Sequence, residues 1–125
     1  MQKGPKYLDI AYIAPRMPIP AIVSILHRIT GVGLFVCLPV LIWLLSGSLN
    51  SEYQFETYRS FIANPLVKII LILLLWAYLH HLLAGLRFLF LDAHKGLELQ
   101  TARLTAKLVA FVAPVLALIV GVLLW

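Results

Sequence analysis

Residues 108–125 read LVAFVAPVLALIVGVLLW, a stretch of eighteen residues without a charged side chain. An α-helix rises about 1.5 Å per residue, so a stretch of this length approaches the thickness of a hydrocarbon core, about 30 Å. Pro114 falls inside the stretch, and helices embedded in lipid tolerate such a proline with a local kink. The stretch therefore predicts a transmembrane helix.

Two further apolar stretches precede it. The first is predicted at residues 21–46, after Pro18 and Pro20, which favour extended backbone before the helix. The second is predicted at residues 65–91. Apolar residues make up 62% of the chain and charged residues 12%, about half of the roughly 25% usual in soluble proteins. We therefore expect an all-α membrane protein with three transmembrane helices in a single domain, residues 1–125.

Charged residues are distributed unequally along the chain. Basic residues occur before or just inside the first stretch and around the second connection, namely Lys3, Lys6, Arg16, Arg28, Arg87, Lys95, Arg103 and Lys107. The connection at 47–64 instead contains two glutamates and one arginine. The positive-inside rule then predicts that the N-terminus and residues 92–107 lie inside, with residues 47–64 and the C-terminus outside. This distribution argues against a nucleic-acid-binding face, despite the net charge of +5. We expect a multi-pass protein of the bacterial inner (cytoplasmic) membrane, with the mitochondrial inner membrane as the alternative.

The sequence lacks the features of disulfide-bonded, secreted and nucleotide-binding proteins. The single cysteine, Cys37, allows no intramolecular disulfide. Prolines interrupt the N-terminal segment where a cleaved signal peptide would need an apolar run. The chain contains no phosphate-binding loop, cysteine cluster, catalytic triad or dinucleotide fingerprint. We therefore predict no catalytic residue for a soluble substrate.

A first polar cluster lies near the start of the first stretch. Ser24, His27 and Arg28 share an arc of roughly 100° on one helix face. Ionisable groups inside a membrane span are costly and are a functional hypothesis by default. A hydroxyl, an imidazole and a guanidinium together suit an acidic or carbonyl-bearing ligand. The structural alternative is that Arg28 extends to the lipid headgroups and Ser24 bonds to its own helix.

A second cluster lies in the second stretch and reads HHLLAGLR, residues 80–87, followed by Asp92. A histidine in an apolar helix can bind haem iron through a neutral imidazole nitrogen. His80 and His81 point about 100° apart, so only one of them can bind a given iron. Gly85 lies one turn further on, where it leaves room for a flat macrocycle. The structural alternative is a hydrogen bond between helices with Gly85 as a packing contact. Both clusters are predicted at similar depths, so one buried site could use both.

At these residues the sequence resembles the cytochrome b subunit of succinate dehydrogenase. The family's Ser-x-x-His-Arg-x-Ser/Thr motif is matched by Ser24, His27, Arg28 and Thr30. Its His-x-x-x-Gly-x-Arg motif, with an aspartate five residues later, is matched by His81, Gly85, Arg87 and Asp92. The resemblance covers the whole three-span layout. One departure is residues 4–9, where family members commonly have Arg-Pro, which puts in doubt only the contacts of that arginine.

The resemblance implies a set of roles. His81 would be one axial ligand of haem b, the other coming from a second small membrane-anchor subunit, so that the chain forms half of a heterodimeric anchor helix bundle. His27 and Arg28 would lie near the haem propionates, Gly85 would pack against the haem, and Ser24 and Arg28 would line the ubiquinone site. An iron–sulfur subunit and a flavoprotein subunit would dock on the inner face. The chain would thus be a non-flavin subunit in electron transport from succinate to ubiquinone, with no enzyme activity on its own.

Two other functions remain open at this stage. An anchor of a quinol:fumarate reductase shares the architecture, and some such anchors lack haem and would not need His81. A small transporter or scaffold could use His81 and Arg28 as proton or substrate contacts. Three spans, however, provide no inverted repeat and no symmetric pathway.

Overall fold

The computed structural model describes residues 10–125, and all of its secondary structure there is helical. The elements are α1 (Ile10–Ile13), the 3₁₀ turn η1 (Ala14–Arg16), α2 (Ile19–Asn50), α3 (Glu52–Ile62), α4 (Pro65–Asp92) and α5 (Leu99–Leu124). Three of them, α2, α4 and α5, are long and apolar enough to cross a membrane. The predicted fold class is confirmed. Residues 1–9, with the departure at 4–9 and two of the basic residues used for the topology, lie outside the described part.

Helix α2 starts at Ile19, two residues before the predicted start, and continues past the predicted end. Pro18 is extended, with φ −66° and ψ 147°, and Pro20 occupies the first turn. The helix was expected to end near residue 46, yet it runs through Pro39 to Asn50. Its last turns are covered by α3, because Gly47 leaves space for the ring of Tyr58. Tertiary contact therefore extends a helix that composition alone would end.

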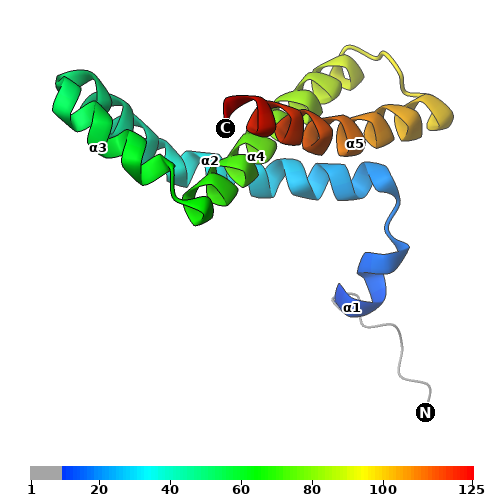
Figure 1. Ribbon diagram of the computed structural model, residues 1–125. Coiled ribbons are helices and arrows are strands. Elements are labelled where there is room, and N and C mark those ends of the chain that lie inside the picture. The colour runs from blue at the N-terminus through cyan, green and yellow to red at the C-terminus, as the bar shows by residue number, and fades with distance from the viewer. Residues whose placement is uncertain (1–9) are drawn as a thin grey trace.

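Helix α3 occupies the connection for which composition predicted no span. The Ser51 hydroxyl caps it by accepting a hydrogen bond from the Gln54 amide at 3.2 Å. Trp43 on α2 packs edge-to-face on Tyr58, with ring centroids 6.1 Å apart. Helix α3 thus folds back along the end of α2 as a short amphipathic helix (Figure 1).

Helix α5 begins nine residues before the predicted apolar stretch, at Leu99 rather than near Leu108. Its first turns are polar and were therefore counted as part of the connection. The actual connection is only 93–98, and it turns sharply because His94 and Gly96 have positive φ values of 57° and 73°. The Lys95 amide bonds back to the Phe90 carbonyl at 2.9 Å, closing the end of α4.

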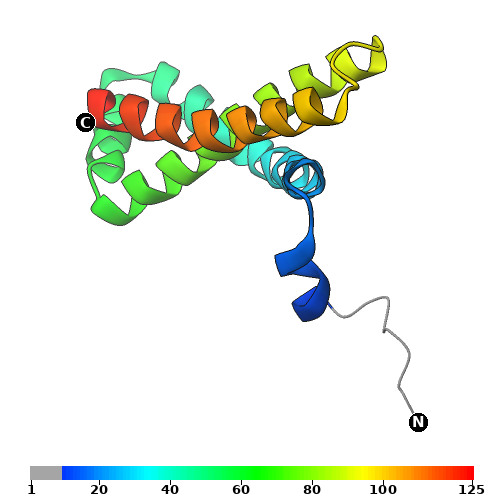
Figure 2. The same cartoon turned by 90° about the vertical axis from the view of Figure 1, so that its right-hand side faces the viewer.

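The three long helices pack through small side chains. Helices α4 and α5 lie side by side, and α2 crosses them (Figures 1 and 2). At the crossing the buried cluster consists of Val23, Ala84, Ala106 and Val109. Further along α5, the buried residues are Ala113, Ala117 and Gly121. Small residues let helix backbones approach closely, as helix packing in lipid requires.

Large apolar side chains lie mostly on the outside of the molecule. Phe35 on α2 is 77% exposed and Leu123 on α5 is 80% exposed, whereas the six buried hydrophobic residues of the described part are all alanine or valine. Water would not tolerate so much contiguous apolar surface, whereas hydrocarbon does. This inversion of the usual soluble pattern supports a membrane protein. Where the membrane surfaces lie along the helices, and which side is inside, stay predictions.

Candidate functional site

The two predicted clusters meet where α2 crosses α4. The imidazole rings of His27 and His81 stack with centroids 4.1 Å apart and an interplanar angle of 6°. The edge of Phe88 packs on His27, with centroids 5.2 Å apart. The expectation that residues of both clusters contribute to one place in the fold therefore holds for this histidine pair.

Hydrogen bonds orient the His81 ring. Its Nδ1 lies 3.0 Å from the carbonyl oxygen of His27. A carbonyl only accepts, so this contact assigns the proton to Nδ1 and leaves the lone pair on Nε2. The Thr30 hydroxyl donates to the Leu26 carbonyl at 2.8 Å and lies 3.5 Å from the same Nδ1. The Nδ1 atom of His81 is thus engaged with the backbone, so Nε2 is the ring nitrogen through which His81 could bind a metal.

Gly31 makes this arrangement sterically possible, and Gly85 faces the pair from the other helix. A Cβ atom on Gly31 would lie 2.8 Å from Cε1 of His81, closer than real Cβ contacts. A Cβ atom on Gly85 would lie 3.4 Å from Nε2 of His27. Each helix therefore provides a glycine opposite the other helix's histidine. Gly85 was predicted to leave room for a macrocycle, and in the structure its nearest neighbour is His27; Gly31 was not singled out from the sequence at all.

His80 has a different environment from its neighbour. It is 1% exposed, contacts the backbone of Val23, and has the Trp76 ring at 5.8 Å. Its Nε2 is buried and has no hydrogen-bond partner among residues 10–125. An iron atom could not reach this enclosed nitrogen without moving a helix, whereas His81 is only half-buried. Of the two adjacent histidines, His81 therefore fits a shared metal better.

The quinone-site candidates lie on the same helix as His27. Ser24 is half-buried and Arg28 is exposed on the surface of α2. Within the described part of the chain, neither side chain has a hydrogen bond or an ion pair. The structure thus brings His27, His81 and Gly85 together and leaves Ser24 and Arg28 at the edge of the crossing, open to whatever covers α2 there.

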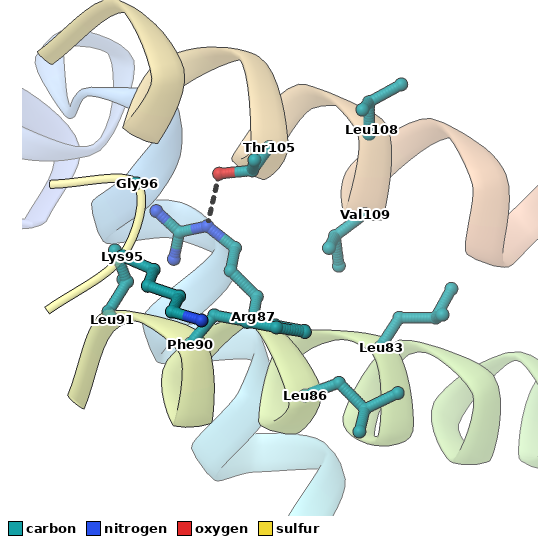
Figure 3. Close-up of a pocket in the computed structure, with 10 residues that line it drawn as sticks. All are labelled: Leu83, Leu86, Arg87, Phe90, Leu91, Lys95, Gly96, Thr105, Leu108 and Val109. Carbon is teal, nitrogen blue, oxygen red and sulfur yellow. Dashed lines mark hydrogen bonds between the residues drawn. The ribbon is translucent and has the colours of Figure 1, made fainter. Parts of the chain in front are cut away.

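Arg87, matched only as a motif residue in the sequence, is buried on the side of α4 that faces α5. It is 8% exposed, and its Nε donates to the Thr105 hydroxyl at 3.0 Å while an Nη donates to the Ala102 carbonyl at 3.0 Å. The sequence feature that could have predicted this burial is the position of the arginine inside an apolar span. Arg87 also lines a cavity of about 390 Å³, which lies between α4 and α5 and does not include His81 (Figure 3).

Asp92, the last residue of the second motif, lies away from the crossing, exposed at the end of α4. Cys37 is a free cysteine on α2. Among residues 10–125 there is no group of three or more histidine, cysteine or acidic side chains that could hold a metal ion.

Fold and site together define the class: a three-span helical membrane protein in which stacked histidines occupy a helix crossing. Residues 7–120 match the family described as succinate dehydrogenase/fumarate reductase transmembrane subunit. The succinate dehydrogenase cytochrome b556 subunit of Paracoccus denitrificans is 38% identical over 104 residues, covering 83% of this chain and 80% of the relative. The subunits of the same name from Coxiella burnetii and Rickettsia felis are 32% and 33% identical over 124 and 110 residues; these cover 98% and 88% of this chain and 98% and 82% of the relatives. The chain belongs to this family as a cytochrome b membrane-anchor subunit of succinate dehydrogenase.

Proposed function

We propose that this chain binds haem b together with a second small membrane-anchor subunit and helps form the ubiquinone-reduction site of a succinate:ubiquinone oxidoreductase. His81 provides one axial ligand, and the partner anchor provides the other. The flavoprotein and iron–sulfur subunits dock on the inner face, and the complex lies in a bacterial inner membrane. The cytochrome b name of the relatives and their bacterial sources support this proposal.

The observation that carries the proposal is the orientation of His81. Its Nδ1 is 3.0 Å from the His27 carbonyl oxygen, so Nε2 is the ring nitrogen left to bind iron. His81 is half-buried, so a group shared with a second subunit could reach it. Haem b bound there would supply a one-electron redox centre.

The residues beside His81 suit the polar edge of that group. His27 stacks on His81, and Arg28 follows it on α2. An imidazole and a guanidinium can both donate to propionate oxygens, and the guanidinium does so with charge assistance. Gly85 keeps α4 narrow beside His27, and we retain it as a haem-packing position.

Ser24 and Arg28 suit the quinone headgroup. Reduction of a quinone places negative charge on its carbonyl oxygens, and a hydroxyl donor with a cation stabilises that charge. Both side chains lie on α2 and have no partner among residues 10–125, so their donors are available. The chain's own contribution to quinone reduction is therefore to bind and orient the headgroup; it supplies no catalytic residue of its own.

A second candidate is an anchor of a quinol:fumarate reductase, because the matching family's description includes fumarate reductase. The named relatives favour succinate dehydrogenase. A transporter or scaffold has no specific observation in its favour.

The test compares His81→Leu with the neighbouring His80→Leu in the membrane complex. Leucine keeps most of the volume and removes the ring nitrogens. We expect His81→Leu to lose the reduced-minus-oxidised haem-b absorbance, and His80→Leu to retain it. Loss in His80→Leu alone would transfer the ligand role to His80. Full haem absorbance in both variants would remove the basis of the proposal.

A further inference from the structure

A groove with charge at one end lies on the side of α4 away from His81. Figure 3 shows Lys95 and Gly96 at one end of it and Leu83, Leu108 and Val109 toward the other, with Arg87 between. Leu86, Phe90, Leu91 and Thr105 complete the lining, and the volume is about 390 Å³. This size lies in the range of roughly 300–1,000 Å³ that is typical of ligand sites. The groove belongs to none of the contacts assigned to haem or quinone.

Arg87 brings a positive charge into this groove without a matching negative charge. It is 8% exposed, and its contacts, the Thr105 hydroxyl, the Ala102 carbonyl and the Phe88 ring at 5.5 Å, are all uncharged. Within residues 10–125 no carboxylate forms a salt bridge with it; the ion pair found there joins Arg59 and Glu56. A buried cation in a membrane span is costly, and an anion compensates it more fully than neutral acceptors do. The geometry therefore calls for an anionic group near Arg87.

Lys95 supplies a second cation at the same end. It follows α4 directly, and Figure 3 shows its side chain turned back toward Phe90 and Arg87 on the groove wall. The opposite end is lined by aliphatic side chains only. The groove thus matches an amphiphile with a negatively charged head and a hydrocarbon chain. Basic pockets between transmembrane helices at the cytoplasmic side recognise anionic phospholipids in this way.

We propose that the α4–α5 groove binds one anionic phospholipid, with its phosphate beside Arg87 and Lys95 and an acyl chain along Leu83, Leu108 and Val109. The lipid comes from the leaflet at which α4 ends. A quinone also has a headgroup and an apolar tail, but it has no formal charge and would leave Arg87 uncompensated. This inference does not depend on the haem or quinone proposals.

The test uses the whole membrane complex reconstituted into nanodiscs of phosphatidylcholine, with or without phosphatidylglycerol. Native mass spectrometry after mild release then counts the phospholipids retained. Basic residues near a membrane surface contribute about 1 kcal/mol each toward anionic lipid, so two predict a preference of about tenfold or more for phosphatidylglycerol. We expect one phosphatidylglycerol to remain bound per copy of this chain.

The matched pair of variants is Lys95→Gln and Arg103→Gln. Each removes one positive charge near the same end of the helices, but Arg103 is exposed on α5 and does not line the groove. We expect Lys95→Gln to reduce the phosphatidylglycerol preference about fivefold and Arg103→Gln to leave it nearly unchanged. Leu86→Trp, which fills the groove without changing charge, should displace the lipid.

Three results would overturn the proposal. The first is an equal effect of Lys95→Gln and Arg103→Gln, since the preference would then reflect the general surface charge. The second is retention of a quinone, or of no molecule at all, by the unmodified complex. The third comes from a photo-reactive cross-linking residue placed at position 86. If it cross-links to a partner subunit and not to lipid, then protein occupies the groove. Because Lys95 is exposed, its variant is expected to fold even if a change at Arg87 does not.

Discussion

Gly31→Ala should disturb the His27–His81 pair although it adds a single methyl group. The new Cβ would lie 2.8 Å from Cε1 and 3.2 Å from Nδ1 of His81. Ordinary van der Waals contact begins at 3.4 Å, so the ring or the helix must move by about 0.6 Å. The ring cannot rotate away freely, because it is stacked on His27 and bonded to the His27 carbonyl. Overpacking of this kind typically costs about 1–3 kcal/mol.

The higher helix propensity of alanine partly offsets this destabilisation. Alanine is favoured over glycine inside a helix by about 1 kcal/mol, so the expected net destabilisation is about 0–2 kcal/mol. We expect a lower thermal midpoint of the complex and, if His81 binds haem, an altered haem-b absorbance or electron paramagnetic resonance spectrum. The control is Gly33→Ala, two residues along α2, where an added Cβ meets nothing within 4 Å. This control should be neutral or slightly stabilising, with an unchanged spectrum.

The comparison refutes the reasoning if Gly31→Ala behaves as Gly33→Ala does in both measurements. The helix crossing would then have room for a methyl group beside His81, and the orientation of the His81 ring could not be attributed to close packing. An altered spectrum in both variants would instead indicate that α2 as a whole responds to added side chains, without a specific contact at Gly31.

Three further predictions concern the quinone site, the topology and the α4–α5 turn. Ser24→Ala should leave the haem spectrum and succinate oxidation with a flavin-level acceptor intact but slow quinone reduction by about 10²–10³-fold if the contact acts in the transition state; Arg28→Leu should be at least as severe, and normal quinone turnover in both would contradict the site. In a Cys37→Ala background, Glu52→Cys should react with an impermeant thiol reagent from the outside only, as the positive-inside rule predicts, and labelling from the inside only would reverse the topology. His94→Gly should stabilise the complex to heat by about 1 kcal/mol, because His94 has a φ of 57° that favours glycine; a lower thermal midpoint would show that the imidazole makes a compensating contact.

Part of the arrangement of the motif residues could be predicted from the sequence. His27 and His81 were expected to share one site because their clusters have similar predicted depth, and the structure brings their rings to 4.1 Å. Helical spacing predicted that His80 and His81 point in different directions, and the two residues are unequally buried in the structure. The choice of His81 as the ligand came from the family resemblance and stays a prediction. The residue that each histidine contacts across the helix crossing could not be predicted from the sequence. Nothing in the sequence indicated that Gly31 would face His81 or that Gly85 would face His27.

The helix bounds differ from the bounds of the predicted spans for one physical reason. Counting apolar residues finds the parts of a helix that face hydrocarbon, so it missed the polar first turns of α5 and the amphipathic helix α3. It also ended α2 too early, because the last turns of α2 are supported by the contact of Gly47 with Tyr58. Arg87 was recognised as a motif residue, but its bonds to α5 depend on how α5 starts and could not be read from spacing.

By itself the sequence determined that this is a three-span helical membrane protein with two polar clusters in its first two spans. These features depend on local sequence alone, because the free-energy cost of placing a side chain or a backbone group in hydrocarbon is set residue by residue. Only the tertiary structure decided which histidine is enclosed, which nitrogen of His81 is left available, and on which side of α4 Arg87 is buried. Those outcomes depend on the angle and register at which α2 and α5 meet α4, and these are set by many small contacts between residues far apart in the chain.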